Sequence, residues 1–124
     1  MKIIVCGGRH FDDYELLKSK MQAVIDMHHL KYEDIEIVSG HCEGADMLGE
    51  KYAQEFGTSI SIFPAQWGKY GRSAGPIRNK QMVDYIKSDP NPLVIAFTNP
   101  RTKGTRNTIK EAKKLNIPVI ETEY

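Results

Sequence analysis

The stretch Ile3-Ile4-Val5-Cys6, followed by Gly7-Gly8, decides the fold of this chain. Its apolar residues are mostly β-branched and end at two glycines, so the run predicts a short strand that is followed by a turn. A continuous apolar run without alternation is typical of a strand that is covered on both faces. We therefore expect this strand to lie inside a parallel sheet.

Further strands are predicted by the same composition of short apolar runs between turn residues. They cover Ile35–Ser39, Ser59–Phe63, Leu93–Phe97 and Pro118–Glu121. Apolar residues at three- and four-residue spacing predict a helix in each interval between strands. The first helix follows a cap at Asp12 or Asp13 and carries Leu17, Met21, Val24, Ile25 and His28, and the second carries Ala45, Leu48, Tyr52 and Phe56 and ends before Gly57. The third helix runs from about Pro76 to Ser88. The fourth carries Thr105, Ile109, Ala112 and Leu115 and ends before Asn116.

Strands that alternate strictly with helices predict an α/β fold with right-handed crossovers. We expect a Rossmann-like three-layer sandwich, in which a five-stranded parallel sheet of order 3-2-1-4-5 carries helices on both faces. The length of 124 residues predicts a single domain over 1–124. The chain shows no signal peptide and no apolar run of membrane-spanning length, so we expect a cytoplasmic protein with no membrane partner. The formal charge of +1 makes nucleic acid an unlikely partner.

Ligands of such sheets bind outside the carboxyl ends of the strands, where the strand order reverses. Four segments follow strands at that edge and are expected to converge there: Gly7–Arg9, Gly40–Asp46, Phe63–Asn79 and Asn99–Thr105. The longest, FPAQWGKYGRSAGPIRN at 63–79, is too long and too rich in aromatic and fixed-φ residues to be an idle loop. It leaves two interpretations open for Trp67, which stacks on a ligand or packs in the core.

The predicted crevice is suited to an anionic ligand, because glycines and cations lie beside the starts of helices. The register of its helix points Arg78 over the strand ends, where it binds phosphate or pairs with Asp46 or Glu43. Asp46 either hydrogen-bonds a ligand hydroxyl or interacts with its own helix dipole. The predicted ligand-binding residues are Gly7, Gly8, Arg9, Gly44, Asp46, Trp67, Arg78, Asn79, Lys103, Gly104 and Thr105.

Several common sites are absent from the sequence. There is no GxxxxGK[ST] motif and no GxGxxG motif, which argues against a P-loop and a standard NAD site. Cys6, His10, His41 and Cys42 match no metal-ligand spacing, and the two cysteines suggest no disulfide framework. We therefore expect no metal and no cofactor.

Successive motifs along the chain resemble those of a known family. They are Gly7–Phe11, Gly40–Asp46, Phe63–Trp67, Gly71–Asn79 and Gly104-Thr105. Together they are similar to the YspA/cpYpsA-related branch of the SLOG superfamily. The chain differs from that branch at His10, where Asp is more frequent, and at Cys42-Glu43, where small or basic residues are usual.

The resemblance implies a Rossmann-like domain that binds or senses a nucleotide-derived molecule, such as a nucleoside phosphate, an ADP-ribose-like compound or a cyclic signal. Related LOG-type phosphoribohydrolases carry PGGxGTxxE, and Thr108 stands here in place of its catalytic Glu. The alternative is therefore an N-glycosidic hydrolase of nucleoside monophosphates that uses Asp46 or Glu43 as the carboxylate. DprA/Smf relatives imply nucleic-acid binding as a second alternative, and superfamily members imply a possible homo-oligomer.

Overall fold

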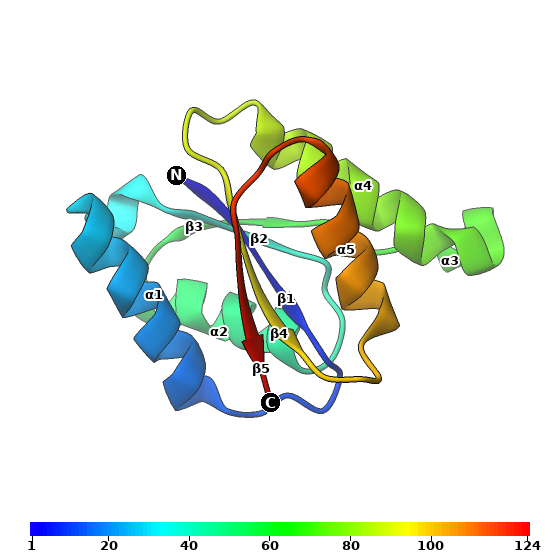
Figure 1. The fold of residues 1–124 in the computed structure, drawn as a ribbon, viewed down its shortest axis with the longest axis horizontal. Helices are drawn as coiled ribbons and strands as arrows, with labels where there is room; N and C mark the ends of the chain where they lie inside the picture. Colours follow the sequence, from blue (N-terminus) through cyan, green and yellow to red (C-terminus); the bar gives the residue numbers. More distant parts are fainter.

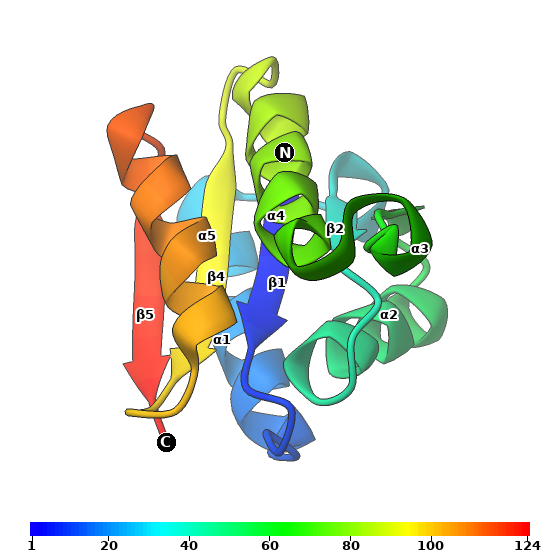
Figure 2. The same ribbon diagram turned by 90° about the vertical axis from the view of Figure 1, so that its right-hand side faces the viewer.

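Five parallel strands form one sheet in the order β3-β2-β1-β4-β5, as predicted (Figures 1 and 2). The computed structural model describes residues 1–124. The elements are β1 (Lys2–Gly7), α1 (Tyr14–His28), β2 (Glu36–Ser39), α2 (Ala45–Phe56), β3 (Ser59–Ile62), α3 (Trp67–Tyr70), α4 (Ala74–Lys87), β4 (Leu93–Thr98), α5 (Lys103–Lys114) and β5 (Val119–Glu123). The chain has a Rossmann-like α/β fold.

Two hydrophobic cores lie on opposite faces of the sheet, because successive side chains of a strand point to opposite sides. Ile3 and Val5 of β1 pack in the core that includes residues of α1 and α2. Ile4 and Cys6 pack in the core that includes residues of α4 and α5. Figure 2 shows α4 and α5 in front of the sheet, with α1 and α2 behind it. Burial on both faces explains why the β1 sequence is apolar without alternation.

The helix ends follow the predicted capping residues. The Asp13 carboxylate accepts a hydrogen bond from Leu16 N at 3.0 Å, at the start of α1. Gly57 ends α2 with φ 77°, and Asn116 has φ 56° just after α5. His28, which was predicted on the apolar stripe of its helix, is instead exposed. The buried stripe of α1 ends at Val24, so the last turn of the helix extends beyond the core.

The segment between β3 and α4 is more regular than the predicted loop. It contains α3 and a 3₁₀ turn over Gly71–Ser73, and these lead directly into α4. The helix predicted to start near Pro76 begins at Ala74. Pro76 therefore lies within the first turn, where a missing N–H leaves no intrahelical bond unmade.

The strand order reverses between β1 and β4, which are paired in register from Ile3 opposite Leu93 to Gly7 opposite Phe97. The carboxyl ends of the two strands are therefore level, and the loops that follow them lead to helices on opposite faces. This arrangement opens the edge of the sheet at the predicted switch point. No helix of the chain has the length and apolar character needed to cross a membrane.

Candidate functional site

A crevice of about 960 Å³ lies at the carboxyl ends of the strands. All four predicted segments contribute to it, since residues after β1, β2, β3 and β4 line its walls. Every predicted ligand-binding residue lines the crevice except Gly44. Glu43, one of the two candidate carboxylates, is exposed and does not line it.

The start of α5 presents unpaired donors to the crevice. The N–H groups of Gly104 and Thr105 donate to no protein acceptor, and no side chain caps the helix. The first turn contains no acidic residue to offset the positive end of the helix dipole. Backbone donors at a helix start favour a bound anion.

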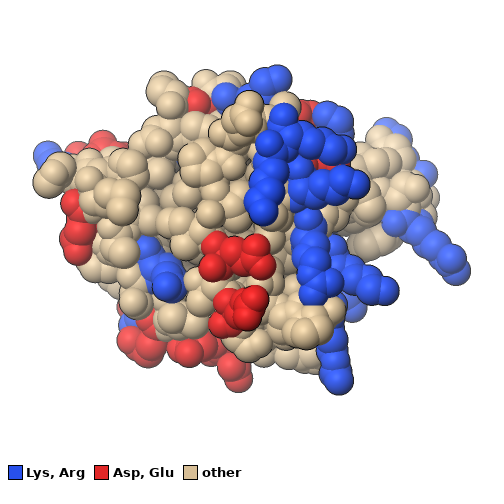
Figure 3. Space-filling model, viewed as in Figure 1, with Lys and Arg blue, Asp and Glu red and all other residues tan.

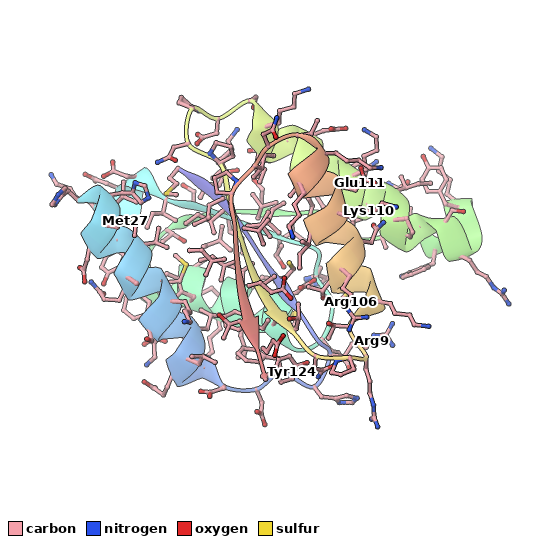
Figure 4. The ribbon with its side chains drawn as sticks, in the orientation of Figure 1. Arg9, Met27, Arg106, Lys110, Glu111 and Tyr124 are labelled. Atoms are coloured by element: carbon pink, nitrogen blue, oxygen red, sulfur yellow. The ribbon has the colours of Figure 1, made fainter.

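Cations surround this end of the crevice. Arg9, Arg101 and Lys103 are exposed crevice-lining residues, and none of them forms an ion pair. Figure 3 shows the Lys and Arg side chains gathered along α5 and beyond its N-terminal end. Figure 4 places Arg9 near the start of α5, at the same end of the sheet as Tyr124. The arrangement provides positive charge that the protein itself does not neutralise.

Asp46 lies at the inner side of the crevice, in the first turn of α2. Its Oδ2 accepts a hydrogen bond from Cys42 N at 3.2 Å, whereas Oδ1 has no hydrogen-bond partner in the protein. The pKa of Asp46 is raised to about 6, mainly by burial. The Glu50 charge adds to this rise, whereas the Cys42 N–H bond and the Arg78 charge oppose it. Asp46 therefore changes charge close to neutral pH.

Arg78 points over the strand ends, as its helix register predicted, and its side chain is buried. The predicted ion pair with Asp46 or Glu43 does not form, since no carboxylate oxygen lies within 4.0 Å of its nitrogens. Its guanidinium instead donates to the carbonyl of Gly40, and both terminal nitrogens lie 3.7 Å from Cys42 Sγ. The protein thus already uses most of the donors that were predicted to hold phosphate.

Asn79 joins α4 to α5. Its amide nitrogen donates to Gly104 O at 3.1 Å and to Asn107 Oδ1 at 3.0 Å. Its amide oxygen accepts from Arg78 Nε at 2.8 Å. The amide therefore holds Arg78 and the start of α5 in place, in addition to lining the crevice.

The glycines of the first two loops are explained by close packing. Gly44 has φ 83°, and a Cβ at that position would lie 2.1 Å from Gly8 O. A Cβ on Gly7 would lie 2.7 Å from Phe97 O. Gly8 O also accepts hydrogen bonds from Phe11 N and Ala45 N. These contacts fix the two loops against each other, whereas Gly104 has open space beside it.

Two aromatic residues flank the crevice. Trp67 is 53% exposed, so core packing, one of its two predicted interpretations, is wrong. Its indole lies over the start of α4, with Cη2 3.4 Å from the position of a Cβ on Gly75. Tyr124 was not predicted; it lines the crevice, and its ring centroid lies 5.0 Å from that of Phe11 in an edge-on arrangement. Its position just after a predicted strand, at the carboxyl edge, is the signal that could have identified it.

A polar cluster beside the crevice was also missed. The buried Glu50 carboxylate accepts from Ser39 Oγ at 2.8 Å and lies 2.9 Å from His41 Nδ1. Glu50 follows Asp46 by one helical turn, which places both carboxyls on the sheet-facing side of α2. That spacing was visible in the sequence.

The position that the LOG signature assigns to its catalytic Glu also faces the crevice. Thr108 lies one turn into α5, where it is buried and lines the crevice wall. A hydroxyl there can donate or accept a hydrogen bond, but it cannot act as a carboxylate. Thr108 therefore faces the crevice but cannot supply the carboxylate of the LOG signature.

Comparisons with known proteins relate the chain to one family. The family model described as YspA, cpYpsA-related SLOG family matches residues 1–70. The chain is 29% identical to the "Gene 61 protein" of Mycobacterium phage D29 over 124 residues, which cover 96% of this chain and 94% of that protein. No solved structure matches the chain.

Proposed function

Because this chain belongs to the YspA, cpYpsA-related SLOG family, we propose that its crevice binds or senses a nucleotide-derived small molecule. Nucleoside phosphates, ADP-ribose-like compounds and cyclic nucleotide signals share the chemistry that the crevice fits. Each combines an anionic group with a ribose and a flat base. The volume of about 960 Å³ lies within the range of small-molecule sites.

The start of α5 is the observation that carries the proposal. Two free backbone N–H groups, of Gly104 and Thr105, face a crevice whose mouth carries unpaired Arg9, Arg101 and Lys103. A cation in the first turn of a helix is unfavourable with respect to the helix dipole. A bound phosphate would accept hydrogen bonds from the free N–H groups and neutralise the cations, so it would relieve both effects.

The remaining walls suit the rest of a nucleotide. Asp46 presents an unengaged Oδ1, which can accept a hydrogen bond from a ribose hydroxyl. Trp67 also lines the crevice and presents an exposed aromatic face, on which a base can stack. Arg78 and Asn79 are already hydrogen-bonded within the protein, so they hold the crevice wall in place.

Isothermal titration calorimetry with a panel of nucleoside monophosphates, dinucleotides and cyclic nucleotides tests the proposal. Replacing Arg9 and Lys103 together by Gln should weaken a binder by about 100-fold or more, because charge-assisted hydrogen bonds contribute roughly 1.5–3 kcal/mol each. Arg72→Gln is the control, since Arg72 is also an exposed cation but does not line the crevice. A panel without a micromolar binder, or equal affinity of the double variant, would contradict the proposal.

Hydrolysis of an N-glycosidic bond is a second candidate function, which the position and the pKa of Asp46 favour. A carboxyl group that titrates near pH 6 inside a ligand crevice can serve as a general acid or base. Release of free base from nucleoside monophosphates should then disappear in Asp46→Asn and persist in Glu43→Gln, because Glu43 lies outside the crevice wall. Turnover that survives Asp46→Asn would remove Asp46 from this role.

A further inference from the structure

The charge of the chain is concentrated in one segment. Residues 101–114 contain six basic residues and one acidic residue, a formal charge of +5. Because the whole chain carries +1, the remaining residues together carry −4. The near-neutral total therefore conceals a basic surface, and net charge alone is a poor guide to the partners of this protein.

These cations share one face of α5. At 100° per residue, Lys103, Arg106, Lys110, Lys113 and Lys114 fall within a sector of about 100°, opposite the buried Thr105, Ile109 and Ala112. We call this set the basic face of α5; all of its members are exposed. Figure 3 shows it as a nearly continuous band, which extends about 17 Å along the helix at a rise of 1.5 Å per residue.

The protein does little to neutralise the basic face. Its one ion pair joins Lys114 to Glu111 at 3.3 Å, and the Arg106 guanidinium donates to the carbonyl of Asn99 at 2.6 Å. Arg106 and Lys110 are four residues apart, as are Lys110 and Lys114. Like charges at this spacing destabilise a helix. A bound polyanion would therefore stabilise this helix.

The basic face continues into the crevice. Lys103 belongs to both, and Arg9 and Arg101 extend the positive charge around the mouth of the crevice. On its other side, the exposed Glu121 and Glu123 of β5 repel an anion. Figure 3 shows acidic side chains over β5, beside the band. A polyanion that starts in the crevice is thus directed along α5.

From this continuity we propose that the basic face of α5 binds the phosphate backbone of a single-stranded nucleic acid whose terminal nucleotide occupies the crevice. The inference rests on the proposed nucleotide site, because a paired nucleotide within a duplex could not enter the crevice. The backbone of the strand provides regularly spaced charges for the lysines. Trp67 provides the stacking surface that single-strand binders use. A membrane surface fits less well, since the basic face carries no exposed apolar side chain to insert.

Fluorescence anisotropy with labelled thymidine and uridine oligonucleotides of roughly 12 nucleotides tests the inference. We expect the logarithm of the association constant to fall linearly with the logarithm of salt concentration, by about 0.7 for each phosphate contact. Lys110→Gln combined with Lys113→Gln should reduce the slope by about 1.4, which corresponds to roughly 25-fold weaker binding at 0.1 M salt relative to a 1 M reference. Neither lysine lines the crevice, so affinity for a mononucleotide should not change.

The matched control combines Lys20→Gln with Lys31→Gln, which removes the same charge from the side of the sheet that carries α1. Weakening by the control equal to that by the Lys110 and Lys113 variant would overturn the inference. Tighter binding of a duplex than of a single strand would also overturn it. A polyglutamate peptide that binds as tightly as the oligonucleotides, through Lys110 and Lys113, would overturn it as well and would identify an acidic protein as the partner. No binding of either oligonucleotide would also overturn it.

The nucleotide site and the basic face can fail separately. If a mononucleotide binds while the oligonucleotides bind no more tightly than it does, the inference fails and the proposed function stands. In a second case, an oligonucleotide binds through Lys110 and Lys113, mononucleotides do not bind, and the Arg9 and Lys103 variant binds the oligonucleotide as tightly as the wild type. That result refutes both the crevice site and its role in holding a strand end.

Discussion

Asp46→Asn should stabilise the protein at pH 7 and remove part of its pH dependence. The carboxyl of Asp46 is buried, has one hydrogen bond from Cys42 N and forms no ion pair with Arg78. Burial disfavours the ionised form more than these neighbours favour it, so the pKa is raised in the folded protein. Asn has the same shape, keeps an oxygen for the Cys42 N–H group and carries no charge.

The magnitude follows from the pKa. Folding raises it from 3.8 to about 6, and one pKa unit corresponds to about 1.36 kcal/mol, so the ionised carboxyl costs about 3 kcal/mol. Below pH 3.8 the group is protonated in both states and the cost is absent. The cost develops as pH rises toward 6 and is nearly complete at pH 7. Between pH 7 and pH 5, Asp46 alone should add about 1.3 kcal/mol to the free energy of unfolding.

Urea unfolding at pH 7 and at pH 5 measures this contribution as the difference between the wild-type chain and Asp46→Asn. The comparison removes the contributions of all other titratable groups, which the two proteins share. Asp12→Asn is the control, since Asp12 is exposed and its carboxylate makes no hydrogen bond. If the wild type and Asp46→Asn respond equally to pH, or if Asp46→Asn is less stable at pH 7, then the Cys42 N–H bond and Arg78 outweigh burial and the reasoning is refuted.

Further predictions concern binding and packing. If Asp46 accepts a ribose hydroxyl as a carboxylate, nucleotide affinity should fall toward tenfold per pH unit below about pH 6, and an unchanged affinity by calorimetry would contradict this. Gly44→Ala should lower the free energy of unfolding by roughly 2–4 kcal/mol, because it combines φ 83° with a contact 2.1 Å from Gly8 O. Gly104→Ala should raise that free energy by about 0.4–1 kcal/mol, since the site is open and helical; a loss on urea unfolding would be inconsistent with this. Asn79→Ala should cost about 2 kcal/mol by leaving the groups that it joins on α4 and α5 unpaired, and a cost below about 0.5 kcal/mol would show that water replaces the amide.

The fold was predictable because its signals are local. The β1 run is apolar on both faces, and this property alone indicates a strand between two layers of helices. Asp13, Gly57 and Asn116 mark helix ends through side-chain capping and left-handed backbone conformation, which depend on neighbouring residues only. The irregular-looking segment after β3 was the exception, because a short helix such as α3 is too brief for periodicity to reveal.

The position of the crevice was also predictable, since parallel topology brings the segments after each strand to one edge. The burial and the hydrogen-bond partners of the residues that line it were not predictable. Whether Trp67 is buried, and whether Arg78 pairs with a carboxylate or with Gly40 O, depends on distances between segments far apart in the chain. Glu50 with Ser39, and Tyr124 beside Gly8, are likewise contacts between separate elements.

The sequence by itself therefore determined the layers, the strand order and the edge at which the crevice lies, because periodicity and turn chemistry act over a few residues. Only the tertiary structure decided which polar groups are already satisfied by the protein and which remain free. Arg78 and Asn79 belong to the first class, and the N–H groups of Gly104 and Thr105 to the second. The reason is physical: hydrogen bonds and burial depend on distances in space, and these exist only once the chain has folded.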